Sequence, residues 1–120
     1  MFLKRVSSAL ANGKAFRGNG KRLGERNNGG NAIEFIGHRN QGILLSREER
    51  WHEAIGSFQK AAEVKPNDAN TRYNLGIAYV RVDDIAAALS EYERLQALDG
   101  QLAGRLYQEI YQRELSSRVR

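Results

Sequence analysis

Small and apolar side chains recur at helical spacing from residue 31 to the end of the sequence. No stretch alternates between apolar and polar residues with a period of two, the pattern that is typical of a half-buried strand. The pattern therefore predicts an all-α fold. We expect about five helices, over residues 32–46, 50–64, 69–81, 84–98 and 101–117.

Local signals mark several of the helix ends. Lys65-Pro66 is expected to end the second helix, because proline disfavours helical geometry in the residue before it. Asp68 and Asp83 are predicted N-caps of the third and fourth helices, since a carboxylate there accepts a hydrogen bond from the exposed first-turn amides. Asp99-Gly100 is predicted to end the fourth helix.

The folded part of the sequence repeats itself with an offset of thirty-four residues. The matching pairs are small, apolar or amide residues: Gly42 with Gly76, Asn40 with Asn74, Ile43 with Ile77, Ala54 with Ala88, and Phe58 with Tyr92. A self-similarity of this period is typical of stacked helix-turn-helix units, which form an α-α superhelix or solenoid.

The residues in these positions resemble the tetratricopeptide repeat family, whose pattern combines an aromatic, Leu-Gly, Tyr, Ala, Phe and Pro. Residues 69–102 match with Leu75-Gly76, Tyr79, Ala88 and Tyr92, and depart from it at Arg72 and Gly100. Residues 35–68 depart more, because His38, Gln41 and Leu45 replace the Trp, Leu and Tyr. The residues that match there are Gly42, Ala54, Phe58, Ala61 and Pro66.

The resemblance implies how the helices pack. Small residues allow two helices to approach closely where they cross, so Gly42 with Ala54 and Gly76 with Ala88 are the predicted crossing points. Phe58 and Tyr92 are expected to fill the gap to the neighbouring repeat. The repeat is lost at Ile110, where a glycine would be needed, so residues 101–117 are predicted to form a capping helix.

The resemblance also implies a non-catalytic role in binding another protein. In this family the first helix of each repeat lines a concave groove that holds a peptide or a helix of the partner. An amide ladder with apolar neighbours suits such a segment, because amides both donate and accept hydrogen bonds. The predicted peptide-binding residues are Arg39, Asn40, Ile43, Tyr73, Asn74, Ile77, Tyr107, Gln108 and Tyr111. The alternative for Asn40 and Asn74 is hydrogen bonding within the helix pair.

One subgroup of the family clamps the terminal carboxylate of chaperone peptides with basic residues and Asn at five places. Arg39 and Asn74 fit two of these places, whereas Ile43, Gly104 and Gln108 occupy the others. We therefore expect no such clamp, and a groove suited to a neutral or mixed segment.

Charge divides the chain at residue 30. Residues 1–30 hold seven basic side chains and one acidic one, a net charge of +6, whereas residues 31–120 hold twelve basic and thirteen acidic ones. Six of the twelve glycines also lie in residues 1–30, so we predict a flexible arm there, with no helix or strand across residues 12–30. The domain is expected to cover residues 31–120.

Three interpretations of the arm stay open. Residues 1–11 resemble a mitochondrial targeting segment or a membrane-surface helix, since apolar residues share one helical face and acidic residues are missing. A second interpretation is docking on RNA, the ribosome or an anionic membrane, and a third is an inert tail. The expected location is cytoplasmic, with the mitochondrial matrix as the alternative. The predicted polyanion-binding residues are Lys4, Arg5, Lys14, Arg17, Lys21, Arg22 and Arg26.

The sequence gives no support to an enzyme. The chain has no cysteine, and its two histidines, His38 and His52, are isolated. The glycines of residues 18–24 have the wrong spacing for a nucleotide loop. We therefore predict no catalytic or metal-binding residue, no cofactor and no small-molecule substrate. The expected function is that of an adapter or assembly subunit, which self-associates or binds another protein.

Overall fold

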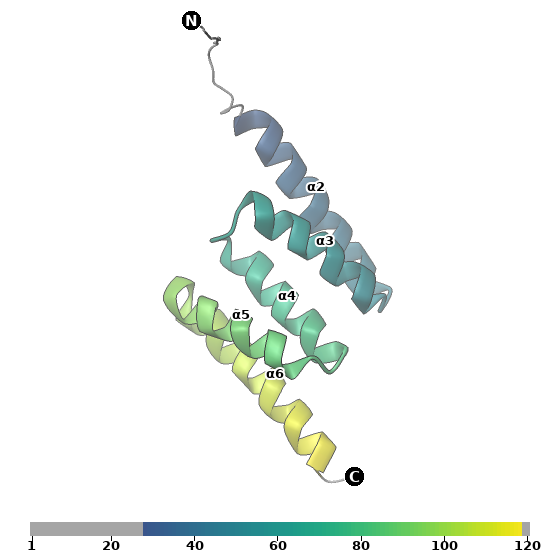
Figure 1. Ribbon diagram of the computed structural model, residues 1–120, viewed down its shortest axis with the longest axis vertical. Coiled ribbons are helices and arrows are strands. Elements are labelled where there is room, and N and C mark those ends of the chain that lie inside the picture. The colour runs from purple at the N-terminus through teal and green to yellow at the C-terminus, as the bar shows by residue number, and fades with distance from the viewer. Residues whose placement is uncertain (1–27, 119–120) are drawn as a thin grey trace, which may run out of the picture. The chain divides into compact units, whose positions relative to one another are not determined.

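The computed structural model describes residues 28–118 (Figure 1), and the residues from Glu34 onward form one compact unit. Within the described residues there are five helices and no strand. The bounds differ from the predicted ones by one residue at most, except at the start of the first helix. The helices are α2 (Asn28–Arg47), α3 (Trp51–Val64), α4 (Ala69–Arg81), α5 (Ile85–Leu98) and α6 (Gly100–Arg118).

Helix α2 begins four residues earlier than predicted, at Asn28, and contains Gly29 and Gly30. The prediction that no helix crosses residues 12–30 is therefore wrong for residues 28–30; residues 12–27 lie outside the described part. A glycine within a helix costs only about 0.5–1 kcal/mol relative to alanine. A helix that is already formed over residues 31–47 can extend by a few such residues, because nucleation is the costly step.

The predicted N-cap of α4 is confirmed, whereas the predicted N-cap of α5 is wrong by one residue. The Asp68 side chain accepts a hydrogen bond from the backbone N–H of Thr71, as predicted for the N-cap of α4. The N-cap of α5 is Asp84, whose side chain accepts from the N–H of Ala87, so the assignment of Asp83 is wrong. Asp83 instead has a φ of 67°, which is a left-handed conformation that cannot start a helix.

Two turns of the fold are the same turn, repeated after thirty-four residues. Glu49 follows α2 with a φ of 61°, and Asp83 follows α4 with a φ of 67°. The N–H of Arg50 donates to the carbonyl of Leu45, and the N–H of Asp84 donates to the carbonyl of Tyr79. This six-to-one bond with a left-handed residue is a Schellman C-cap, a position that usually holds glycine.

Replacing Glu49 by glycine is expected to stabilise the domain by about 1 kcal/mol, because a left-handed backbone costs a residue with a side chain about 1–2 kcal/mol. The free energy of unfolding in urea measures the gain. Lys60→Gly, an exposed change inside α3, should instead destabilise by about 1 kcal/mol through lost helix propensity. Equal losses in both variants would contradict the strain at Glu49.

Consecutive helices lie side by side (Figure 1), and their contacts make two clusters of buried residues. The first cluster joins α2, α3 and α4, and the second joins α4, α5 and α6. The members of the first are Leu45, Ala54, Phe58 and Leu75. The members of the second are Val80, Ala88, Leu95, Ala103, Leu106 and Ile110.

Gly42 and Gly76, which stand thirty-four residues apart, are approached by different neighbours. A Cβ atom built on Gly42 would lie 2.6 Å from the ring of Phe58, which belongs to the same helix pair. A Cβ atom on Gly76 would lie 2.5 Å from Leu106 of α6, so the close approach there is to the next helix. Tyr92 is the counterpart of Phe58 in the second repeat, but it is half-exposed. The space over Gly76 is filled by Leu106 instead.

Candidate protein-binding surface

The nine residues predicted to line a groove lie on α2, α4 and α6, the first helix of each repeat and the capping helix. All nine are half-buried or exposed, so none of them is hidden in the core. Asn40, Tyr107, Gln108 and Tyr111 are exposed. Arg39, Ile43, Tyr73, Asn74 and Ile77 are half-buried.

The amides of the predicted ladder are not used inside the domain. Among the hydrogen bonds between residues 28 and 118, none involves the side chain of Asn40, Asn74 or Gln108. Their donors and acceptors therefore remain for solvent or a ligand. This disfavours the alternative in which Asn40 and Asn74 bond within the helix pair.

The apolar residues of the surface differ in how much of each side chain is exposed to a ligand. Tyr73 and Ile77 pack against the second buried cluster and so serve the fold as well. Tyr107 and Tyr111 stack with ring centroids 6.4 Å apart, and Tyr107 lies 5.5 Å from the ring of Tyr92 on α5. Three tyrosines therefore run from α5 onto the exposed side of α6.

Arg39 is held by its own helix. Its guanidinium lies 5.5 Å above the ring of Phe35, a cation-π distance, and Lys65 approaches the same ring to 4.9 Å. The Nε atom of Arg39 is buried and has no hydrogen-bond partner among the described residues.

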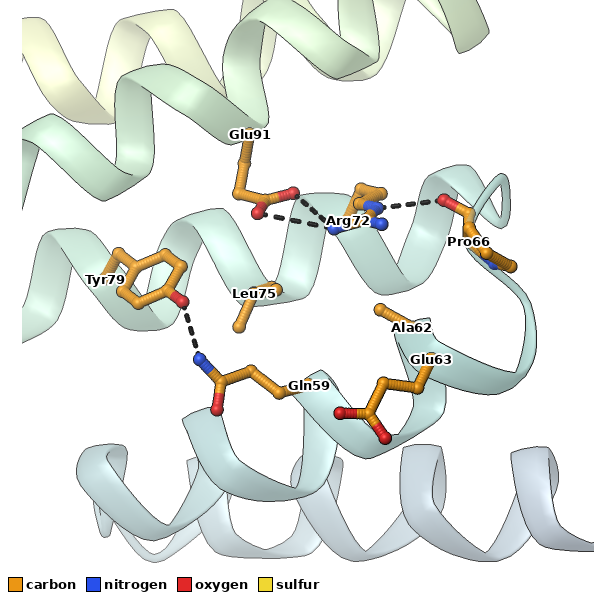
Figure 2. Close-up of a pocket in the computed structure, with 8 residues that line it drawn as sticks. All are labelled: Gln59, Ala62, Glu63, Pro66, Arg72, Leu75, Tyr79 and Glu91. Atoms are coloured by element: carbon orange, nitrogen blue, oxygen red, sulfur yellow. Dashed lines mark hydrogen bonds and ion pairs between the residues drawn. The ribbon is translucent and has the colours of Figure 1, made fainter.

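A further pocket lies elsewhere, between α3, α4 and α5 (Figure 2). It has a volume of about 510 Å³, and an ion pair between Arg72 and Glu91 forms part of its wall. The Nη1 atom of Arg72 donates to both carboxylate oxygens of Glu91 at 3.3 and 3.4 Å, and its Nε donates to the carbonyl of Pro66 at 2.9 Å. Gln59 donates to the hydroxyl of Tyr79 across the same pocket.

The ion pair of Arg72 and Glu91 is buried, and this burial disfavours the charged form of Glu91. The side chains of Arg72 and Glu91 are only 11% and 8% exposed. Burial raises the pKa of Glu91 above its usual range, although the positive charge and hydrogen bonds of Arg72 oppose this. Desolvation therefore outweighs the attraction, as is common when two charges leave water.

Sequence reasoning missed this pair, although two signals were present. Arg72 replaces the aromatic of the repeat pattern, and Glu91 lies on the helical stripe of Ala88 and Leu95, where buried residues are expected. A charged residue at a packing position in each of two neighbouring helices indicates an internal ion pair.

The seven predicted polyanion-binding residues of the arm lie outside the described residues, as does the segment that resembles a targeting signal. Within residues 28–118 no group of three or more metal-ligating side chains comes together. No helix in that range is long and apolar enough to cross a membrane.

Comparison with known proteins agrees with the geometry. Residues 46–83, which span α3 and α4, match the family model of the TPR repeat. The chain carries tetratricopeptide (TPR) repeats. Superkiller protein 3 of Schizosaccharomyces pombe is 36% identical to this chain over 62 residues, which is 52% of the chain. The chain spans only 4% of that relative's length.

The TPR match indicates the general function of the repeats. TPR repeats are generally non-catalytic modules for protein-protein interaction, and their stacked helices present an extended surface to a partner. In this chain α2 and α4 carry Asn40 and Asn74, whose side chains make no hydrogen bond within residues 28–118.

Proposed function

We propose that the TPR repeats bind a peptide or helical segment of a partner protein along α2, α4 and α6, and that the chain acts as an adapter or assembly subunit. The observation that supports this best is the amide ladder. Asn40, Asn74 and Gln108 recur every thirty-four residues, are accessible, and make no side-chain hydrogen bond among the described residues. A backbone segment could pair with them while the nearby apolar side chains add contact area.

A test must remove the amides without damaging the fold. Tyr73 and Ile77 pack against the core, so their truncation would confuse binding with stability. Asn40→Ala with Asn74→Ala changes only side chains that hold nothing inside the domain. Gln41→Ala with Asn67→Ala is a matched control, because it removes two exposed amides that lie outside the ladder.

The Asn40→Ala, Asn74→Ala variant is expected to weaken partner binding by about ten- to a hundredfold, because each lost hydrogen bond contributes about 0.5–1.5 kcal/mol. Affinity capture from the native lysate identifies the partner, and titration of that partner gives the dissociation constant. The control variant should bind like the unmodified chain. An unchanged dissociation constant in the ladder variant would contradict this surface.

The charge division favours a second candidate, in which residues 1–30 dock on RNA, the ribosome or an anionic membrane. Such binding falls steeply with salt, since it depends on the release of counterions. Deleting residues 1–30 should abolish it and leave capture through the ladder intact. A cytoplasmic location, or the mitochondrial matrix if the arm is a targeting segment, remains a prediction for imaging of the tagged chain.

A further inference from the structure

Helix α6 carries a stripe of tyrosine, leucine and polar side chains that the other described helices leave largely exposed, although Tyr107 contacts Tyr92 of α5. Tyr107, Tyr111 and Leu115 are 46%, 50% and 38% exposed, and they border a pocket of about 300 Å³ whose floor includes Ile110. We call this surface the α6 stripe. Its members are Gly104, Tyr107, Gln108, Tyr111, Leu115 and Arg118.

The α6 stripe continues an interface that is already formed inside the domain. Tyr107 and Tyr111 stand thirty-four residues after Tyr73 and Ile77. On α4 these two residues pack against the cluster that α4 forms with α5 and α6. On α6 the same register positions are exposed, because no described helix packs over them. The stripe is therefore shaped to receive one more helix.

The stripe is also complementary to itself. At about 100° per residue, its members lie on one side of α6, with Tyr111 near the middle. If a second α6 packs antiparallel about a twofold axis at Tyr111, residues equally far from position 111 meet. Tyr107 then faces Leu115 of the second copy. Within one copy, Glu114 lies on the same flank of α6 as Tyr107, and Gln108 lies on the opposite flank.

The ends of the stripe match in the same way. Arg118 meets Gly104 of the second copy in this arrangement. A Cβ atom built on Gly104 would have no neighbour within 4 Å, so the space above it is open in the single chain. The aliphatic stem of an arginine can lie over such a gap and keep its charged head in water.

We propose that the α6 stripe is the interface of a homodimer, in which two α6 helices pack antiparallel about a twofold axis at Tyr111. An isologous contact of this kind closes after two copies, and tyrosines are typical anchors of such interfaces. The dimer goes beyond the proposed partner binding. It covers Tyr107, Gln108 and Tyr111 of α6, so in the dimer the partner binds through α2 and α4 alone, with Asn40 and Asn74 as the accessible amides.

Cysteine crosslinking tests the axis directly, because the natural chain contains no cysteine. The full-length Tyr111→Cys variant is expected to form a disulfide-linked dimer under mild oxidation, since only a residue on the axis meets its own copy. Leu89→Cys, which replaces a side chain of similar exposure on α5, should stay mostly monomeric. A mixture of Gly104→Cys and Arg118→Cys chains should crosslink more than either alone.

Sedimentation of the unmodified full chain measures the dimer without a crosslink. We expect Tyr111→Arg to raise the dimer dissociation constant at least tenfold, about the effect of 1.4 kcal/mol, whereas Leu89→Arg leaves it unchanged. A chain that is monomeric at about 100 µM, or a dimer that Tyr111→Arg does not weaken, would overturn the proposal.

Two further outcomes separate the occupants of the stripe. A monomer whose partner binding is lost in Tyr111→Arg would assign the stripe to the partner and overturn the dimer. A chain that dimerises only after deletion of residues 1–30 would assign it to the arm, with the same consequence. The test of Asn40 and Asn74 uses no residue of α6, so the two proposals can fail independently.

Discussion

Phe58→Ala is expected to lower the free energy of unfolding by about 3–5 kcal/mol, the usual cost of removing a fully buried ring. Phe58 is 1% exposed and joins Leu45, Ala54 and Leu75 in the cluster that holds α2, α3 and α4 together. The free energy of unfolding of a small domain is only about 0.05–0.15 kcal/mol per residue. The variant should therefore lose a large share of the total free energy of unfolding.

The measurement is urea unfolding followed by far-ultraviolet circular dichroism and by the fluorescence of Trp51, the one tryptophan of the chain. Trp51 begins α3 and lies beneath the Arg81 guanidinium of α4 at 5.6 Å, so it reports on the contact of these helices. Tyr92→Ala is the matched control in the second repeat. It should cost less, because Tyr92 is half-exposed.

A second variant tests the mechanism as well as the magnitude. The ring of Phe58 occupies the space that a side chain on Gly42 would need. Gly42→Leu alone should therefore destabilise the domain by overpacking. Combined with Phe58→Ala, it should fill part of the cavity and recover stability, so that the two changes are strongly non-additive. Additive losses would show that the two residues do not share this space.

Arg72→Leu is expected to destabilise the domain by about 3–5 kcal/mol at neutral pH, because it leaves the carboxylate of Glu91 buried without its counter-charge. The Glu91 side chain is 8% exposed, and no described side chain other than Arg72 hydrogen-bonds to it. The double variant Arg72→Leu, Glu91→Leu should recover most of the loss, since two apolar residues can replace a buried ion pair at little cost.

The pH dependence of this loss has a definite sign. Burial already raises the pKa of Glu91, and removal of Arg72 raises it further, because the charge and hydrogen bonds of Arg72 no longer oppose the shift and only the weaker attraction of Arg94 remains. The folded state then binds a proton more tightly than the unfolded state. Stability contributed by protonated Glu91 is present below the unfolded pKa of about 4.3 and is lost as pH rises towards the folded pKa.

Urea unfolding between pH 4 and pH 8, roughly the span over which a raised carboxyl pKa is visible, measures this effect. The deficit of Arg72→Leu relative to the unmodified chain should grow with pH. Arg50→Leu is the control, because the side chains of Arg50 and Glu53 are 52% and 58% exposed and water screens their attraction, so their pair should contribute little to stability. A deficit that is the same at every pH would exclude Glu91 as its cause.

The candidate surface was predicted in part from the thirty-four-residue period. The period places Asn40, Asn74 and Gln108 at equivalent positions, and the structure leaves all three accessible. It does not say that Tyr73 and Ile77 also pack in the core while Tyr107 and Tyr111 lie outside it. That difference arises because α4 has helices after it and α6, within the described residues, has none.

The sequence by itself determined the all-α class, the helix bounds from Trp51 onward and the cap at Asp68. These depend on neighbours a few residues away, through periodicity, proline and side-chain capping. Only the tertiary structure decided that Gly76 admits Leu106 and that Arg72 pairs with Glu91. Such contacts join residues nineteen or thirty positions apart, and they depend on which side chain fills the space left where helices of neighbouring repeats meet.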